Sequence, residues 1–297
     1  MSILIPVKYH SRQYPAGIQA KVCEVAGHFD TVTIGSYQRY SLHTEYSYAS
    51  RRLDSHLIGQ FPAIKRATKH GVPQLWRDSE WAIAFADFIH ALVGCNGKNP
   101  PEVIEIHPPF DDYCVTFNKF LACYSIFEKR IGQLFPSTVI LLENRFGTRY
   151  RGGRFLVTSP TDIADLVLEL DTTYLNLGIA LDVPQLVSQI GGVNALLNGG
   201  LETMLSTLHP ARHRIVGLHL WGKKNSQTGR RCSHVGNFDS YFEDEPQMKN
   251  LFLKGLLDLL SDGRARYFVP EVNSNDIDVC SIVRDMESVG FMFNGVT

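Results

Sequence analysis

Short apolar runs alternate with helix-forming patterns along most of this chain, and that alternation limits the folds it can adopt. A repeated order of strand and helix favours parallel strands, because two parallel strands cannot be joined by a tight turn. Eight runs have the length and composition of buried strands: Ile3–Lys8, Thr31–Gly35, Val72–Leu75, Val103–His107, Val139–Glu143, Gly178–Asp182, Val216–Leu220 and Tyr267–Glu271.

Helical patterns, with apolar residues three and four positions apart, lie between many of these runs. Eight strand units in 297 residues favour a single-domain (β/α)8 TIM barrel of the α/β class, spanning residues 1–297, over an open doubly wound sheet. The polar, aromatic stretch Tyr37–Lys69 is expected to form a long loop over the barrel mouth. The helical segments are Glu80–Gly94, Asn118–Leu134, Thr161–Leu170 after the start signal SPTD, Lys249–Leu260 and Asp276–Val289.

Composition excludes several classes of protein. The chain is 44% apolar and 20% charged with a net charge of −1, which is typical of a globular protein without general affinity for polyanions. Its six cysteines form no CxxC pair, so we expect reduced thiols and a cytoplasmic location. No signal peptide is expected, because the short N-terminal apolar run has no basic region ahead of it and no small-residue cleavage site. No membrane span is expected, since no apolar run approaches about 18 residues.

The run Ile3–Lys8 is followed by KYHSRQYPAG, which lacks the glycine fingerprint of a dinucleotide-binding fold. We therefore expect no nucleotide cofactor.

Five successive candidate strands end in a carboxylate or an imidazole. Unpaired buried charges cost several kcal/mol, so core packing alone does not explain this pattern, whereas a bound cation would remove the cost. In a barrel the carboxyl ends of the strands meet on the face that carries catalysis. These strand-end residues are His107, Glu143, Asp182, His219 and Glu271.

Glu143, Asp182, His219 and Glu271 would together offer carboxylate oxygens and one imidazole nitrogen to a divalent metal. This ligand set suits Mn, Zn, Fe, Co or Mg and does not choose among them. The structural alternative is a network of ion pairs without a metal.

The phrases LLEN, ALDVPQ, LHLWGKK and PEVN, in this order, resemble the xylose isomerase-like superfamily of TIM barrels. The resemblance covers most of the chain from Val72 onward. It implies either a sugar isomerase or epimerase, or an abasic-site nuclease of the endonuclease IV type.

In endonuclease IV-like enzymes, the resemblance implies three zinc ions with additional ligands. The chain keeps the fourth-strand histidine, His107, but has Gln74 and Gln185 where two further histidines are expected. After the seventh strand, one alignment puts Arg230 and Cys232 at the ligand positions, and a shifted alignment makes His234 a ligand. On either alignment the third metal site is lost. His107, Gln74, Gln185 and His234 are therefore candidates for a second metal or for substrate contact.

The surviving four-ligand set is the one that the isomerase and epimerase branch uses. By this resemblance we expect a sugar or sugar-phosphate isomerase or epimerase, in which Glu143 and Glu271 transfer protons as base and acid. The alternative is an endonuclease IV-like phosphodiesterase acting on DNA. A third hypothesis is metal-dependent oxidation of peptides, as in related barrels with DVNN and HLAGH motifs.

Cations follow the fifth and seventh candidate strands and would surround the barrel mouth. They predict an anionic or carbohydrate substrate, because arginine forks suit phosphate and aromatic rings stack on sugars or bases. A solvated surface without a ligand is the plainer interpretation. A homo-oligomer is compatible with the sequence. The candidate binding residues are Arg145, Lys223, Lys224, Arg230 and Trp221.

Overall fold

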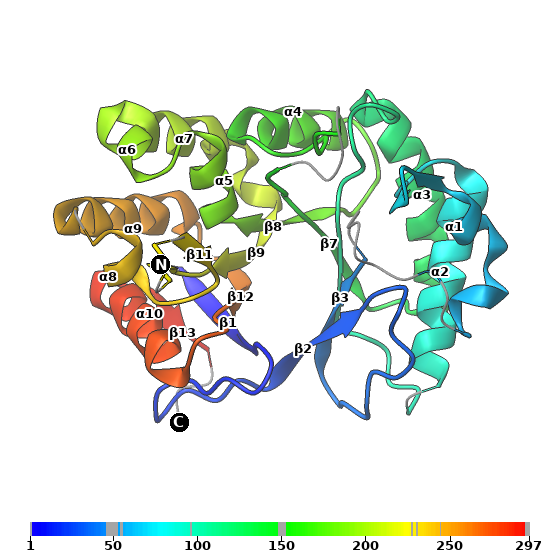
Figure 1. Cartoon of the computed structure of the whole chain (residues 1–297), viewed down its shortest axis with the longest axis horizontal. Coiled ribbons are helices and arrows are strands. Elements are labelled where there is room, and N and C mark those ends of the chain that lie inside the picture. The colour runs from blue at the N-terminus through cyan, green and yellow to red at the C-terminus, as the bar shows by residue number, and fades with distance from the viewer. Residues whose placement is uncertain are drawn as a thin grey trace. The chain divides into compact units, whose positions relative to one another are not determined.

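The computed structural model describes residues 2–45, 53, 56–95, 97–147, 153–226, 228–229, 231–243 and 245–294 (Figure 1). Its main sheet has the strand order β12-β9-β8-β7-β6-β3-β2-β1-β13, and β12 also pairs with β1, so the sheet closes on itself. The fold is therefore a (β/α)8 barrel, as the alternation in the sequence predicts. The chain divides into two compact units, described in turn below.

The unit of Val25–Thr158 and Asp165–Ile179 contains three parallel strands of the barrel. These are β3 (Tyr40–Thr44), β6 (Val103–Ile106) and β7 (Val139–Glu143), paired in the order given. Helices α2 (Ser79–Gly94) and α3 (Phe117–Leu134) pack on each other. Buried aromatic rings, among them Trp76 and Phe127 at a centroid distance of 5.2 Å, fill the space next to these helices. We call this part the β3–β7 unit.

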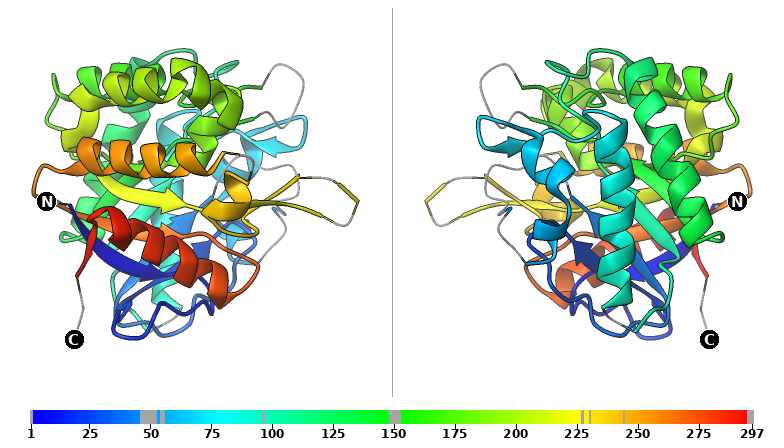
Figure 2. Two further views of the ribbon diagram at one scale, coloured as in Figure 1. Left: turned by 90° about the vertical axis from the view of Figure 1, so that its left-hand side faces the viewer. Right: turned by 90° about the vertical axis from the view of Figure 1, so that its right-hand side faces the viewer.

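The second unit comprises Met1–Glu24, Ser159–Ala164 and Ala180–Thr297, and we call it the β9–β1 unit. Its parallel strands are β9 (Ile215–Leu220), β12 (Ala265–Pro270), β1 (Ile3–Lys8) and β13 (Met292–Phe293). Helices α7 (Leu201–Leu208), α9 (Pro246–Leu260) and α10 (Asp276–Val289) lie in series, with α9 between the other two (Figure 2). A hairpin of β10 (Lys223–Asn225) and β11 (Arg231–Ser233) projects from this unit.

Several helices begin where a polar side chain caps the first turn. Asp78 and Thr116 accept hydrogen bonds from backbone N–H groups in the first turns of α2 and α3. Ser159 and Asp162 exchange two such bonds where α4 (Pro160–Leu170) begins, which accounts for the SPTD signal. All five predicted helices are confirmed, with starts shifted by up to three residues.

Two of the predicted barrel strands are wrong. Thr31–Gly35 is not a strand: Ile34 is buried, but Val32 and Thr33 are exposed. The second barrel strand is β2 (Val22–Gly27), whose Val22 and Val25 are buried. Within Val72–Leu75 only β5 (Val72–Pro73) forms, paired with β4 (Thr68–Lys69) in a separate two-stranded sheet. Pairing with distant strands, which local propensity does not reveal, decides both cases.

The third barrel strand, β3, lies inside the stretch Tyr37–Lys69 that was expected to be a loop. This stretch also contains α1 (Pro62–Arg66), while residues 46–52, 54 and 55 lie outside the described residues. No helix separates β1 from β2 or β2 from β3 in the described part of the chain, so the alternation begins only after β3. Among the described residues, none of the helices combines the length and apolarity needed to cross a bilayer.

Candidate functional site

The five predicted strand-end residues all lie at or next to the carboxyl ends of barrel strands. In the β3–β7 unit, His107 directly follows β6 and Glu143 is the last residue of β7. In the β9–β1 unit, Asp182 ends β8 (Gly178–Asp182), His219 is the penultimate residue of β9 and Glu271 follows β12. All five side chains are buried.

A compact group of three side chains forms in the β3–β7 unit. The Nε2 atoms of His43 and His107 lie 3.1 Å apart, and Glu143 Oε2 lies 3.0 Å from the first and 2.7 Å from the second. The two imidazole rings are stacked with a centroid distance of 4.9 Å. We call these residues the His43 group.

The three converging atoms of the His43 group are close enough to share one metal ion. A tetrahedral ion with bonds of 2.0–2.1 Å separates its ligand atoms by about 3.3 Å, so these atoms would move apart by about 0.2–0.6 Å around such an ion. Neutral imidazole nitrogens and a carboxylate oxygen repel one another through their lone pairs unless a proton or a cation lies between them. The group therefore fits a divalent metal.

The surroundings of His107 prepare it to bind through Nε2. Its Nδ1 atom lies 3.2 Å from the backbone oxygen of Glu45, so an N–H donated there leaves Nε2 as the lone-pair nitrogen. Trp76 Nε1 donates to the backbone oxygen of His107 at 2.7 Å and fixes this turn. Burial lowers the pKa of His107 to about 4, although Glu143 opposes the shift, and the neutral form is the one that binds metals.

Glu143 is held as a carboxylate. Burial alone would raise its pKa, but Arg145 and His107 together hold the pKa of Glu143 well below its usual value. Arg145 Nη1 lies 3.1 Å from Glu143 Oε1, opposite the oxygen that faces the histidines. Arg145, predicted from the sequence to bind an anion, thus pairs with a residue of the chain itself.

In the β9–β1 unit, Glu271 has two imidazoles beside it. His219 Nδ1 lies 3.2 Å from Glu271 Oε1, on the adjacent paired strand. His234 Nδ1 lies 3.4 Å from Glu271 Oε2 and 3.2 Å from the backbone oxygen of the same residue. His234 has a φ of 60°, which is unusual for a residue with a side chain, so local structure holds it in place.

Asp182 serves as both strand end and helix cap. Its Oδ1 accepts a hydrogen bond from the backbone N–H of Gln185 at the start of α5 (Val183–Gln189). Trp221 Nε1 lies 3.1 Å from both carboxylate oxygens of Asp182, and the Trp221 ring stacks on His234 at 4.3 Å. Trp221 therefore contacts Asp182 and His234 contacts Glu271, and the two rings that make these contacts stack on each other.

His43 is a candidate site residue to which the sequence interpretation assigned no role. The third barrel strand was expected at Val72–Leu75, which made Gln74 a candidate ligand, but the third barrel strand is β3, and it carries His43 next to its last residue. Gln74 lies after β5, and its N–H bonds to the backbone oxygen of Ala67. The signal was the phrase LHTE in YSLHTE, where an apolar strand end carries an imidazole and a carboxylate.

Of the cationic residues predicted after the seventh strand, the structure describes Lys223 and Lys224 but not Arg230. Lys223 is half-buried at the start of β10 and Lys224 is exposed, while Arg230 lies outside the described residues. Cys232 pairs with Lys224 across the hairpin and is half-buried.

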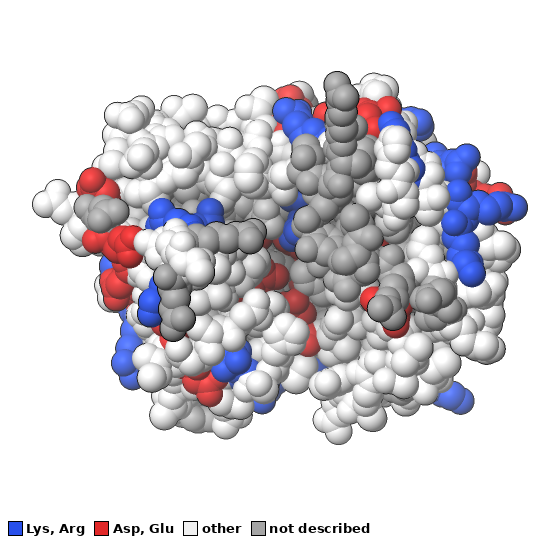
Figure 3. All heavy atoms as spheres, in the orientation of Figure 1, with Lys and Arg blue, Asp and Glu red and all other residues white. Residues whose placement is uncertain are grey.

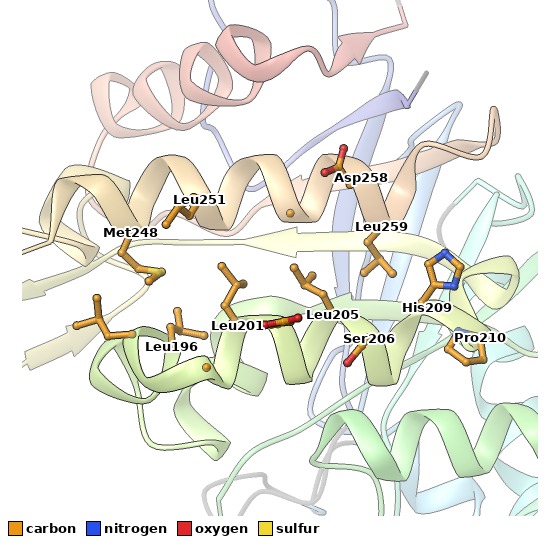
Figure 4. Close-up of a pocket in the computed structure, with 14 residues that line it drawn as sticks. Leu196, Leu201, Leu205, Ser206, His209, Pro210, Met248, Leu251, Asp258 and Leu259 are labelled. Atoms are coloured by element: carbon orange, nitrogen blue, oxygen red, sulfur yellow. The ribbon is translucent and has the colours of Figure 1, made fainter.

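A separate cavity of about 870 Å³ lies between α7 and α9 of the β9–β1 unit (Figure 4). Leucine and methionine side chains line most of it, including Leu196, Leu201, Leu205 and Met248. None of the predicted site residues contributes to this lining, so the cavity is distinct from the strand-end groups.

No protein-family model and no curated protein sequence matches the chain. Among solved structures, it is similar to endonuclease IV from Thermus thermophilus, at 15% identity over 90% of this chain and 97% of that one, with a TM-score of 0.46. It is also similar to a xylose isomerase domain protein from Alicyclobacillus acidocaldarius, at 13% identity over 97% and 98% of the chains, with a TM-score of 0.47.

A further similar structure is that of D-psicose 3-epimerase with D-tagatose from Clostridium cellulolyticum. The identity is 12% over 96% of each chain, with a TM-score of 0.40. At identities this low, none of them assigns a reaction or a substrate to this chain.

Proposed function

We propose that this chain is a metal-dependent enzyme that hydrolyses a phosphoester, and that the His43 group binds one of its metal ions. The observation that carries the proposal is the convergence of His43 Nε2, His107 Nε2 and Glu143 Oε2 within 3.1 Å of one another. The sequence alone suggested one complete metal site, and its candidates for a second metal or for substrate contact included His107 but not His43. A histidine-rich group in addition to that site favours hydrolysis over proton transfer, because sites with several metal ions are common in phosphoester hydrolases.

Two imidazoles and one carboxylate suit zinc, iron, cobalt or manganese better than magnesium, which prefers oxygen ligands. The bound metal would supply Lewis-acid chemistry, lowering the pKa of a water nucleophile and withdrawing charge from a phosphoryl oxygen. The chain's own residues prepare this site. The Glu45 carbonyl orients His107, and Arg145 keeps Glu143 charged.

The sequence-based ligand set of Glu143, Asp182, His219 and Glu271 remains part of the proposal. Within the β9–β1 unit, support comes from the contacts of Glu271 with two histidines and of Asp182 with Trp221. Both carboxylates are buried, and a cation beside them would offset the cost of removing their charges from water.

Isomerisation or epimerisation of a sugar or sugar phosphate is the second candidate. The observation in its favour is the pair of buried strand-end glutamates, Glu143 and Glu271, which could act as base and acid. Against it, Arg145 and two histidines already engage Glu143, which weakens this carboxylate as a base.

The test is a parallel assay of the protein loaded with Zn²⁺ or Mn²⁺. One substrate is a duplex oligonucleotide carrying an abasic-site analogue, and the others are keto sugars and their phosphates. Metal-dependent strand cleavage that His43→Ala abolishes, and that the exposed-helix control His90→Ala retains, is the expected result. Interconversion of sugar epimers without cleavage would establish the second candidate instead.

A further inference from the structure

Lys223 lies beside two aromatic rings of the β9–β1 unit that contact each other edge to face. Its Nζ atom lies 5.4 Å from the centroid of the Trp221 ring and 5.5 Å from that of Tyr241, on α8 (Phe238–Tyr241). It also donates a hydrogen bond of 2.6 Å to Ser188 Oγ on α5. The ammonium group is therefore fixed by cation–π contacts and by one hydrogen bond.

Ser188 fixes the position of the Lys223 ammonium group and uses only one of its N–H donors. The Ser188 hydroxyl donates to the backbone oxygen of Pro184 at 2.7 Å and so accepts from Lys223 with its oxygen. An ammonium group has three N–H donors. Because Ser188 is its one hydrogen-bond partner among the described residues, two donors of Lys223 are available to a ligand.

A second cation shares the Tyr241 ring. The guanidinium carbon of Arg231 lies 5.8 Å from the ring centroid, and Arg231 Nη2 donates to the backbone oxygen of Tyr241 at 2.7 Å. In the described part of the chain, neither Lys223 nor Arg231 forms an ion pair. By contrast, Lys249 of the same unit pairs with both Asp239 and Asp285.

Two like charges around one ring repel each other, and an anion between them would offset that repulsion. Burial lowers the pKa of Lys223, the Arg231 charge lowers it further and Asp182 raises it. Basic side chains lie beside the β10–β11 hairpin on the face that Figure 3 shows.

The base of the hairpin is packed closely enough to fix these cations. A Cβ atom on Gly222 would lie 2.4 Å from the backbone of Gly236, and one on Gly236 would lie 2.2 Å from Ser240 Oγ. Gly236 also has a φ of 85°, which favours glycine. The two backbone segments thus touch directly beside Lys223, so its position does not depend on the outer part of the hairpin.

The subsite adjoins a predicted metal ligand. The indole ring that contacts Lys223 is the same ring whose Nε1 donates to both oxygens of Asp182. An anion bound by Lys223 would therefore lie near the Asp182 carboxylate, at a distance comparable to the width of the indole ring.

We propose that Lys223 and Arg231 form an anion subsite, with Ser188 as its positioning residue, that binds a phosphate group of the substrate beside Asp182. The inference rests on the proposed phosphoester chemistry for its role in catalysis. Phosphate binding itself can be measured independently of any reaction.

The experiment is calorimetric titration of the metal-loaded protein with inorganic phosphate, for wild type, Lys223→Met, Lys223→Arg and the control Lys254→Met. Lys254 is an exposed lysine on α9 of the same unit, so its variant removes the same charge elsewhere. We expect Lys223→Met to weaken phosphate binding about tenfold or more, since hydrogen bonds to charged groups are strong. Lys223→Arg should restore part of the affinity, and Lys254→Met should match wild type.

The accompanying measurements separate the outcomes. Metal content and Tm should be the same in all four proteins, so that a loss of phosphate affinity is not a loss of metal or of folding. If a phosphodiester is cleaved, Lys223→Met should raise KM more than it lowers kcat. Equal phosphate affinity in wild type and Lys223→Met would overturn the subsite. Lys223-dependent phosphate binding in a protein that cleaves no phosphoester would retain the subsite and overturn the proposed function.

Discussion

The Nε2 atom of His107 lies 2.7 Å from Glu143 Oε2, and both side chains are fully buried. Such a short contact in the protein interior requires a shared proton or a cation. The neighbouring His43 Nε2, 3.0 Å from the same oxygen, makes a cation the better match.

Removal of metal should destabilise the protein. A ligand that binds only the folded state stabilises it by about 2.7 kcal/mol at a free concentration 100 times its Kd. We expect a chelator to lower the Tm of wild type, and Zn²⁺ or Mn²⁺ to restore it. In His107→Ala the same treatment should leave Tm unchanged if the His43 group supplies the main site. An equal fall in both proteins would contradict this assignment.

Trp221→Phe should weaken metal binding in the β9–β1 unit while keeping the aromatic packing. It removes the N–H that contacts both oxygens of Asp182. Loss of a hydrogen-bond partner behind a metal ligand typically lowers metal affinity by about 10–100-fold. Competition with a chromophoric chelator measures this change.

Trp81→Phe is the matched control for that experiment. Trp81 is fully buried, and its Nε1 has no hydrogen-bond partner among the described residues. The control should therefore retain the wild-type metal affinity even if its Tm falls. A Trp221→Phe protein that binds metal as tightly as the control would show that the indole N–H does not support Asp182.

Asp262→Asn should destabilise the fold without affecting metal content. Both carboxylate oxygens of Asp262 contact the fully buried Arg266 guanidinium, at 3.0 Å and 2.8 Å. Hydrogen bonds between charged groups contribute on the order of 1.5–3 kcal/mol, so we expect a loss of about 2 kcal/mol in urea unfolding. Arg284→Ala, which removes an exposed charge on α10, should change the free energy of unfolding much less.

The same ion pair predicts part of the acid sensitivity. Burial alone would raise the pKa of Asp262, but hydrogen bonds and charge from Arg266 and Arg264 outweigh it and lower the pKa. A carboxylate with a lowered folded-state pKa contributes stability above its unfolded pKa of about 3.9, and loses it as pH falls through the lower folded value. The stability difference between wild type and Asp262→Asn should therefore be constant above about pH 5 and shrink below about pH 4. A difference that grows on acidification would contradict the assignment.

The sequence predicted the second half of the barrel more accurately than the first. From Val103 onward, the barrel strands β6, β7, β8, β9 and β12 are mainly apolar runs with a carboxylate or an imidazole at or next to the last residue, and the predicted helices between them have clear apolar periodicity. These local signals agree with the final pairing, so His107, Glu143, Asp182, His219 and Glu271 were found at strand ends.

The first third was misassigned because its local signals disagree with the tertiary pairing. Thr31–Gly35 has higher β-propensity than Tyr40–Thr44, yet β3 pairs with β6 and buries Leu42 against Ile104 and its neighbours. His43 could not be assigned without knowing that pairing. The four-ligand site, the single domain, the cytoplasmic location and the oligomeric state remain predictions from the sequence.

The contact between Gly222 and Gly236 also bears on how this protein can change over evolutionary time. Because the hairpin is anchored at its base, insertions or substitutions beyond Asn225 and Arg231 should leave Lys223 where it is. If Lys223 binds an anion as proposed, substitutions in the outer part of the hairpin should leave phosphate affinity unchanged. A library randomised only at that tip would be a compact starting point for altering specificity.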